Sequence, residues 1–346
     1  MDKSNDKEKL IKNKPTIMEK KITQLDNLIP YLKSRIIGQD EVINNISEKL
    51  KYWYLGLSSS NRPSSFFFMG PTGTGKTELV LEIVNFFFGS KEKILRLDMS
   101  ELNSVTGSGV GKFFLGESMD NPGRLYSFLE NNSSGAILYD EFEKAHPDIA
   151  KYMLQQLDAG RVTLWNNKTY NLSNFLIFFT SNIGSDIFTA NKFLSMERKS
   201  QAALNRLKEH YNMPELVARM GSFNYGIFAF NQLTAQNLRD ITNKFIKDRI
   251  IYLKKLTSRE NQSFNSLPEI IIESYTQEVV EYILLQTSNT LNGAREIREL
   301  TERLLNNVCS LALRQCPKAK RLQIKIFTDK SNNIDINVLA NFSKDN

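Results

Sequence analysis

The sequence predicts an α/β protein, with a parallel five-stranded sheet flanked by helices and a smaller C-terminal α+β domain. Short apolar runs rich in aromatic and β-branched residues recur at residues 65–69, 94–98, 136–139, 175–180 and 226–230. Helix-patterned segments separate most of these runs, as in a parallel sheet that is covered on both faces. After residue 230 longer helical patterns dominate, which indicates a second unit.

The C-terminal unit begins with a predicted helix near residues 234–256, a short strand around 269–272 and a helix over 277–285. A third helix is expected after Gly293, because apolar residues recur there at intervals of three or four. These residues are Ile297, Leu300, Leu304, Val308 and Leu311. Two alternating stretches, 322–327 and 334–338, predict the last strands. We therefore expect a charged, flexible tail over residues 1–30, a large domain over 31–230 and a small domain over 231–346.

Length and composition are those of a soluble globular protein. The 346 residues suffice for two hydrophobic cores, and 41% hydrophobic and 24% charged residues are ordinary values. No run approaches the roughly 18 consecutive apolar residues that span a bilayer. The N-terminus also lacks the apolar core of a signal peptide. We expect a cytoplasmic protein without a membrane partner.

Cysteine and histidine chemistry has little support. Cys309 and Cys316 lie seven residues apart in a helix-patterned stretch, roughly 10 Å, which is beyond disulfide reach. With only two histidines, a zinc cluster is not expected. The net charge of +7 arises from basic residues intermixed with 38 acidic ones, so it permits an acidic partner without identifying one.

The segment GPTGTGKT carries the clearest chemistry, because it follows the first apolar run and opens a helical pattern. A glycine-rich loop between strand and helix turns its backbone N–H groups around phosphates, and the helix N-terminus adds positive potential. Lys76 is expected to reach the β- and γ-phosphates, and Thr77 to bind Mg²⁺. A chance glycine turn is the alternative, which the strand–loop–helix context disfavours. The predicted nucleotide-phosphate site consists of Gly70, Pro71, Thr72, Gly73, Thr74, Gly75, Lys76 and Thr77.

Polar side chains follow two later strands. Asp140 and Glu141 end the third apolar run, and Asn182 ends the fourth. In doubly wound folds such strand ends lie beside the phosphate loop. Asp140 is therefore expected in the Mg²⁺ shell, through water, and Glu141 as the group that orients or deprotonates the attacking water. Asn182 is expected to hydrogen-bond the γ-phosphate or the water; in isolation, the acidic pair reads as surface charge and Asn182 as a turn residue.

Several segments in order, including RIIGQDE, GPTGTGKTEL, LRLDMSE, DEFEKAHPDI, LQQLDAGRVT and FFTSNIGS, resemble the AAA+ module of Clp-type unfoldases. The similarity is closest to the second ATPase module of the ClpB-type disaggregases and extends to the final strands. It implies that ATP and Mg²⁺ are the cofactors. It also implies a homo-oligomeric ring, usually a hexamer, in which ATP lies between neighbouring subunits.

The resemblance assigns roles to four further residues. PELVARM matches the segment with the arginine finger, so Arg219 is expected to contact ATP bound to the adjacent subunit. GAREIREL matches the second sensor motif, in which Arg295 contacts nucleotide from the small domain. Ile36 and Ile37 match the apolar pair that flanks adenine. For the two arginines, an exposed surface charge is the alternative.

Clp-type proteins carry an aromatic pore loop between the second strand and the acidic pair. The matching stretch is GKFFLGES, so Phe113, Phe114 and Leu115 are expected to grip a polypeptide by non-directional apolar contact. Burial of both rings in the core is the alternative, which the neighbouring glycines disfavour.

Departures from the family pattern limit these expectations. The segment around the finger reads Ala218-Arg219-Met220-Gly221, where relatives have Asn-Arg-Ile-Asp. The resemblance includes neither the helical middle domain nor the substrate-collecting N-domain of disaggregases, so neither is expected here. No Ile-Gly-Phe or Ile-Gly-Leu tripeptide, which would dock a peptidase, occurs in the segment after Asn182, so no Clp-type peptidase partner is expected.

The sequence thus predicts an ATP-dependent unfoldase or remodelling motor that threads a polypeptide substrate through a ring, with or without an adaptor. Two alternatives stay open. A remodeller of nucleic acid is disfavoured because no basic stripe with interleaved aromatics is present. A nucleotide-switched assembly scaffold would use the same ATP site without pulling on a substrate.

Overall fold

The computed structural model describes residues 16–58, 62–102, 116, 118–146, 149–190, 195–211, 214–221, 225–258, 267–287, 293–329 and 331–342. Its larger lobe contains a five-stranded sheet with the order β2-β3-β6-β1-β7, and all pairings are parallel. The strands are β1 (Ser64–Met69), β2 (Ile94–Asp98), β3 (Gly135–Asp140), β6 (Phe175–Ser181) and β7 (Ile227–Ala229). The predicted fold class is confirmed, and the strands coincide with the five apolar runs to within one or two residues.

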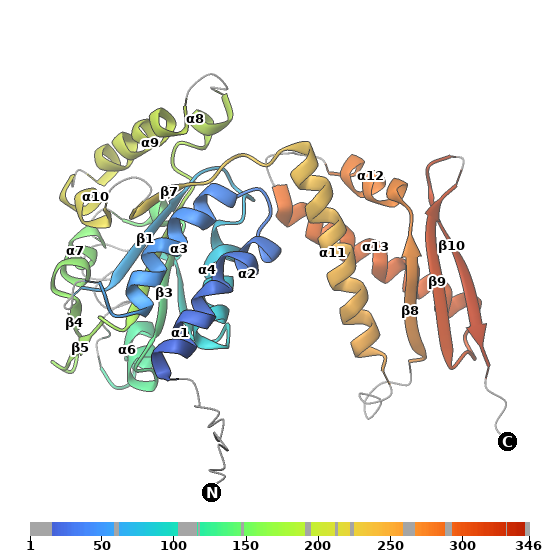
Figure 1. The fold of residues 1–346 in the computed structure, drawn as a ribbon, viewed down its shortest axis with the longest axis horizontal. Coiled ribbons are helices and arrows are strands. Elements are labelled where there is room, and N and C mark those ends of the chain that lie inside the picture. The colour runs from blue at the N-terminus through green and yellow to red at the C-terminus, as the bar shows by residue number, and fades with distance from the viewer. Residues whose placement is uncertain are drawn as a thin grey trace, which may run out of the picture.

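Helices cover both faces of this sheet (Figure 1). Because neighbouring residues of a strand point to opposite faces, Phe66 and Phe68 pack on one face and Phe67 on the other. The first face packs against α3 (Asp40–Tyr54) and α4 (Lys76–Phe88). The second face is covered by α6 (Arg124–Asn131), α7 (Ile149–Ala159), α8 (Ser185–Ala190), α9 (Met196–Tyr211) and α10 (Pro214–Met220). Continuous aromatic and aliphatic runs are what such a two-sided core requires.

The large lobe also contains short elements at its margin. The single-turn helices η1 (Met99–Leu102) and η2 (Phe142–Lys144) follow β2 and β3. The strands β4 (Arg161–Thr163) and β5 (Thr169–Asn171) form a separate antiparallel pair.

The N-terminal segment is more ordered than expected from its charge. Two helices, α1 (Ile17–Asp26) and α2 (Leu28–Arg35), occupy a stretch that was expected to belong to a flexible tail over residues 1–30. That expectation is wrong from residue 17 onward, because Leu25, Leu28 and Leu32 are buried against the α3 and α4 side of the sheet. Leu28 and Leu32, four residues apart, lie on one face of α2, and Leu25 is the buried residue of α1. Thr16 and Glu19 also close a capping box at the start of α1.

The smaller lobe combines α11 (Ala235–Leu256), α12 (Gln277–Leu285) and α13 (Gly293–Gln315) with a three-stranded sheet. Its strands are β8 (Glu269–Tyr275), β9 (Arg321–Thr328) and β10 (Ile334–Asn341), in the order β10-β9-β8. The predicted boundary near residue 231 lies between β7 and α11, and the division into domains stays a prediction. The buried row of α13 includes Ile297, Leu305 and Val308, whereas Leu311 of the predicted stripe is 47% exposed.

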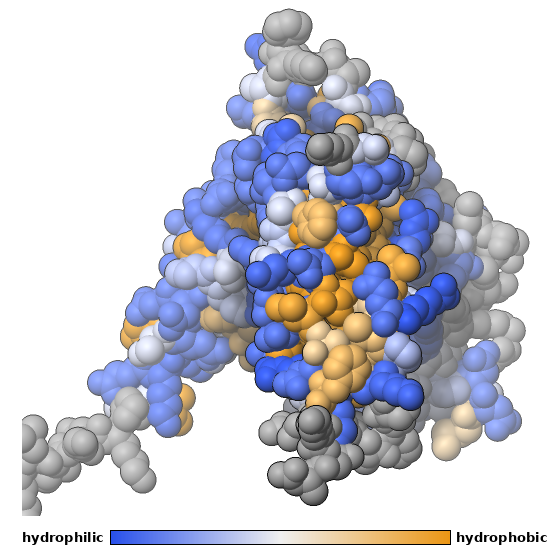
Figure 2. Space-filling view, turned by 90° about the vertical axis from the view of Figure 1, so that its right-hand side faces the viewer, coloured by the Kyte–Doolittle hydropathy of each residue, from blue (hydrophilic) through white to orange (hydrophobic). Residues whose placement is uncertain are grey.

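Apolar side chains gather on the outer side of the smaller lobe (Figure 2). A groove of about 390 Å³ there runs between α12, α13 and the start of β10. Within the described part of the chain, no helix has the length and apolar content needed to cross a membrane.

Candidate functional site

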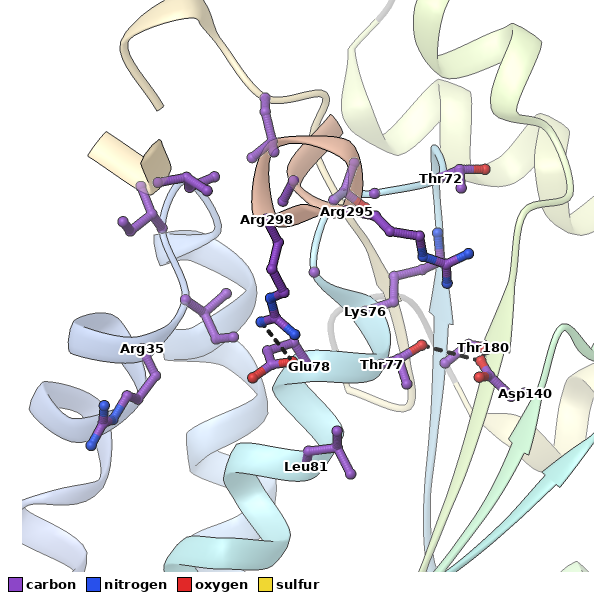
Figure 3. A pocket seen from close by; sticks show the side chains of 18 of the residues that line it. Arg35, Thr72, Lys76, Thr77, Glu78, Leu81, Asp140, Thr180, Arg295 and Arg298 are labelled. Atoms are coloured by element: carbon purple, nitrogen blue, oxygen red, sulfur yellow. Dashed lines mark hydrogen bonds and ion pairs between the residues drawn. The ribbon is translucent and has the colours of Figure 1, made fainter. Parts of the chain in front are cut away.

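A cavity of about 310 Å³ lies where the two lobes meet, at the carboxyl ends of the central strands (Figure 3). Its floor is the loop between β1 and α4, and its walls come from β2, β3, β6 and the smaller lobe. Most residues predicted to bind nucleotide or to act in hydrolysis line it. They are Ile36, Ile37, Thr72, Gly73, Thr74, Gly75, Lys76, Thr77, Asp140, Glu141, Asn182 and Arg295.

Gly70 and Pro71 do not line the cavity but shape its floor. A Cβ at Gly70 would meet the carbonyl oxygen of Phe230 at 2.7 Å, and the residue has φ +134°. Pro71 accepts a hydrogen bond from the Thr74 hydroxyl through its carbonyl at 2.8 Å. At the N-cap of α4, Gly75 has φ +98°, a conformation that other residues rarely adopt. The glycines therefore set the loop geometry from which the backbone N–H groups of α4 face the cavity.

Lys76 is the central cation of the loop and is only 7% exposed. Its ammonium donates to the carbonyls of Gly70 and Pro71, both at 2.7 Å, and to Asn182 Oδ1 at 2.9 Å. Burial lowers the pKa of Lys76 to about 8, and the carboxylates of Glu143, Asp140 and Glu141 oppose that shift. The lysine thus stays mainly charged at neutral pH and is joined directly to Asn182, the residue expected to contact the γ-phosphate or the attacking water.

Asp140 ends β3 and is buried. Its Oδ1 accepts hydrogen bonds from the hydroxyls of Thr77, at 3.2 Å, and Thr180. Its Oδ2 accepts two from Arg96, from Nε at 2.9 Å and from Nη2 at 2.5 Å. The sequence did not single out Arg96 or Thr180, because their role depends on β2 and β6 being the two neighbours of β3.

The hydroxyl of Thr77 and the carboxylate of Asp140 fit a magnesium site. They are hard oxygen donors within 3.2 Å of each other at the edge of the loop. Mg²⁺ at phosphate sites takes one or two protein oxygens and completes its shell with phosphate and water. Such a site needs no large carboxylate cluster, and among the described residues no group of three or more His, Cys, Asp or Glu side chains suited to a metal is present.

Glu141 has a backbone φ of +55°, in the left-handed region that non-glycine residues rarely adopt. Its backbone N–H donates to the Thr180 hydroxyl at 3.1 Å, which helps to hold this turn. Its carboxylate accepts a hydrogen bond from Lys144 Nζ at 2.5 Å. This contact raises the pKa of Lys144. The strained turn thus places the carboxylate at the cavity wall, where it is paired with a lysine.

The smaller lobe contacts the phosphate loop directly. At the start of α13, the backbone N–H of Ala294 donates to the Gly73 carbonyl at 3.2 Å. Gly293 has φ +49°, and a Cβ there would meet the same carbonyl oxygen at 2.8 Å. Figure 3 shows Arg295 and Arg298 extending from this helix toward the loop and α4. The helix start therefore sits on the loop through backbone atoms.

Other cavity residues from this side were not predicted. Arg298 pairs with Glu78 of α4 at 3.4 Å and lies 4.9 Å from the centre of the Phe245 ring. Helical periodicity marks α11 as amphipathic but gives no sign of which side chains meet ligand. The remaining unpredicted lining residues on this side are Leu233, Ile241 and Lys244.

Two predicted groups do not join this cavity. Arg219 on α10 does not line it; its Nε instead lies 2.9 Å from a carboxylate oxygen of Asp158, and its side chain is 44% exposed. The predicted pore-loop residues Phe113, Phe114 and Leu115 lie outside the described residues.

Comparisons with known proteins identify a family that this chain resembles. Residues 61–223 match the model of an AAA domain (Cdc48 subfamily). The chain is 32% identical, over 331 residues, to a ClpA-homologue ATP-binding subunit of the ATP-dependent Clp protease from Cyanidium caldarium, covering 87% of this chain and 36% of that protein. It is 32% identical over 290 residues to the chaperone protein ClpB of Rickettsia bellii, covering 82% and 31%. The chain thus spans about a third of the length of these curated relatives.

Solved structures of Hsp104 also resemble this chain. A closed-state reconstruction of Hsp104 with ATPγS and casein aligns with a TM-score of 0.75 at 26% identity, covering 93% of this chain and 53% of that chain. An extended Saccharomyces cerevisiae Hsp104–casein complex aligns with a TM-score of 0.73 at 27% identity, covering 90% and 52%. The likeness therefore includes both lobes.

Proposed function

Since the chain belongs to the Clp/Hsp100-type AAA+ ATPases, we propose that it forms a homo-oligomeric ring, a hexamer, that threads polypeptide through a central pore. The module binds nucleotide and hydrolyses ATP as its family does. The proposed role is that of a chaperone or of a factor that disassembles complexes, without a peptidase. The observation that supports the ATP-driven function is the cavity between the lobes. The phosphate loop, the strand end with Asp140 and Glu141, Asn182 and Arg295 all line it.

Within this cavity, each side chain has a proposed task. The Lys76 ammonium exchanges its carbonyl partners for the β- and γ-phosphate oxygens, since it already lies at the loop. Thr77 and Asp140 would hold Mg²⁺, which when bound neutralises phosphate charge. Asn182 and Arg295 contact the γ-phosphate end of ATP, and Ile36 and Ile37 flank adenine.

Glu141 is the proposed general base. To act on water, its carboxylate has to turn from Lys144 toward the γ-phosphate, and the pairing at 2.5 Å opposes that movement before ATP is in place. The ion pair would then delay hydrolysis until ATP is in place. Because both partners are partly exposed, the pair is a weak restraint that binding energy can overcome.

Arg219 is proposed to act on ATP bound to a neighbouring subunit. Its position outside the cavity of its own chain supports this role, since a finger in trans has to lie on a different surface from the site that it completes. Phe113, Phe114 and Leu115 are the proposed grip on substrate. The casein in the two Hsp104 structures is a precedent for a polypeptide as substrate.

The test is electron microscopy of the Glu141→Gln protein with ATP and Mg²⁺, with casein as the polypeptide. We expect intact ATP binding, little turnover, closed rings and extended density along the pore. The matched control is Lys76→Ala, which should abolish ATP binding and rings together. Rapid turnover by Glu141→Gln would exclude the base assignment, and rings without polypeptide density would favour a nucleotide-switched scaffold over a threading motor.

A further inference from the structure

We propose that Arg96 is a built-in counter-cation for Asp140, which neutralises this carboxylate in the absence of metal and competes with Mg²⁺ for it. The inference rests on the proposed nucleotide site and adds a regulatory residue to it. Arg96 lines the same cavity, from the edge strand β2.

The position of Arg96 follows from strand register. Arg96 lies opposite Leu138 in the parallel pair of β2 and β3, and Asp140 is two residues further along β3. Because side chains of a strand alternate, residues 138 and 140 share one face of the sheet, the face that packs against α4. The long arginine side chain spans this offset and reaches the carboxylate with two nitrogen atoms.

The difference in burial between the two groups gives the pair its function. The Asp140 side chain is only 6% exposed, so water cannot replace a lost cation easily. Arg96 is 50% exposed and can leave without a comparable cost. Of the described residues, Arg96 is the cation within 4.0 Å of the Asp140 carboxylate.

All four donors to Asp140 matter for the metal. Oδ1 carries the two threonine hydroxyls and Oδ2 carries the two arginine N–H groups. A divalent cation beside Thr77 would be repelled by the Arg96 guanidinium and would have to share the Asp140 carboxylate with it. Conversely, ATP without metal meets a carboxylate whose charge is already compensated. By linkage, removal of Arg96 should weaken the binding of metal-free ATP. It should also lower the Mg²⁺ concentration at which ATP binding is half-saturated.

The experiment measures binding of a fluorescent ATP analogue to the full chain, first in EDTA and then during a Mg²⁺ titration. For Arg96→Ala we expect about a tenfold loss of affinity in EDTA, and half-saturation at lower Mg²⁺ than in the wild type. Arg96→Lys keeps the charge without the two-nitrogen contact, so both its affinity in EDTA and its half-saturating Mg²⁺ concentration should lie between those of the wild type and Arg96→Ala. The control is Arg206→Ala, which removes an exposed pair with Asp186 at 2.6 Å outside the cavity and should leave both values unchanged.

A double variant separates charge compensation from simple support of the fold. Adding Asp140→Asn to Arg96→Ala removes the uncompensated carboxylate, so affinity in EDTA should recover. Equal losses with and without Mg²⁺, or no recovery in the double variant, would overturn the inference. A wild-type chain that fails to bind the analogue even with Mg²⁺ would refute the proposed nucleotide site instead.

Discussion

At the level of single residues, the half-buried Lys49 and the buried Lys76 show how packing changes the pKa of a lysine in this fold. Lys49 on α3 donates to the Ser65 carbonyl at 2.5 Å, and its ammonium lies 4.7 Å from the centre of the Phe66 ring. Burial lowers the pKa of Lys49 to about 8, as it does for Lys76. Lys49 lies outside the nucleotide cavity, so its titration reports on stability alone.

Stability should therefore rise with pH above the folded-state pKa of Lys49. The ordinary lysine value is 10.5, so between about pH 8 and 10.5 the unfolded chain holds a proton that the folded chain has lost. Between pH 7.5 and 9 we expect the free energy of unfolding of the wild type to gain about 1 kcal/mol relative to Lys49→Met. Urea denaturation at both pH values measures this. The exposed Lys20→Met is the control, and equal pH dependence in wild type and Lys49→Met would contradict the prediction.

The residues that the sequence identified in the site are those within short motifs. Lys76, Thr77, Asp140 and Glu141 each lie at a fixed place relative to one strand end, so local pattern suffices to find them. Arg96 lies 44 positions from its partner Asp140 in the chain, and the pairing depends on strand order and register. Single-sequence patterns do not determine strand order, which explains why this contact was missed.

At the level of elements, the start of α13 forms a contact between the lobes that leaves no room for an added side-chain atom. Gly293 combines a positive φ with a close approach to the Gly73 carbonyl, and Ala294 donates a hydrogen bond to the same oxygen. The site therefore depends on backbone packing between a helix and a loop that are more than 200 residues apart.

Gly293→Ala should accordingly impair nucleotide binding more than stability. The added Cβ pushes against the loop carbonyl at 2.8 Å, so we expect about tenfold weaker ATP binding. Gly89→Ala is a matched control, because Gly89 has φ +71° but open space around its Cβ position. Both variants should lose about 1 kcal/mol of stability from backbone strain. Calorimetric ATP titration and thermal melting separate the effects, and equal ATP affinities would contradict the prediction.

Helices and strands were largely predictable, because the helical spacing of apolar residues and the short apolar runs of strands can be recognised in a single sequence. The exceptions have physical causes. Charge in the N-terminal stretch suggested a tail, but Leu25, Leu28 and Leu32 supply enough apolar contact to order α1 and α2. On α13 the predicted stripe was partly misplaced, since Leu311 is 47% exposed and the polar residue Thr301 occupies a buried position that an apolar count does not register.

At the level of the whole molecule, the proposed ring makes each active site a shared structure. In this ring Glu141 would belong to the chain that binds ATP, and Arg219 to its neighbour. Assembly could be inferred only from family resemblance, because a single chain contains no signal for the surface that it presents to a copy of itself. The arrangement nevertheless has a measurable consequence.

Mixing two inactive variants should restore activity. When Arg219→Ala and Glu141→Gln chains assemble at random in equal amounts, about one quarter of the sites contain Glu141 and face Arg219. We expect steady-state ATPase activity near that fraction of wild type, from parents that are each nearly inactive. The control mixture combines Glu141→Gln chains with chains that carry both Glu141→Gln and Arg219→Ala, and it should stay inactive because no chain in it supplies Glu141. Absence of recovery in the first mixture would exclude the role of Arg219 in trans.

The seating of α13 on the phosphate loop also has a mechanical meaning. The helix has 23 residues and is therefore about 35 Å long, with one end fixed to Gly73 and the rest extending through the smaller lobe. If α13 moves as a rigid rod, its N-terminal end at the phosphate-binding loop is the pivot, and the C-terminal end moves furthest. A tilt of about 5° at the loop would displace the far end by about 3 Å, which would suit the proposed threading motor.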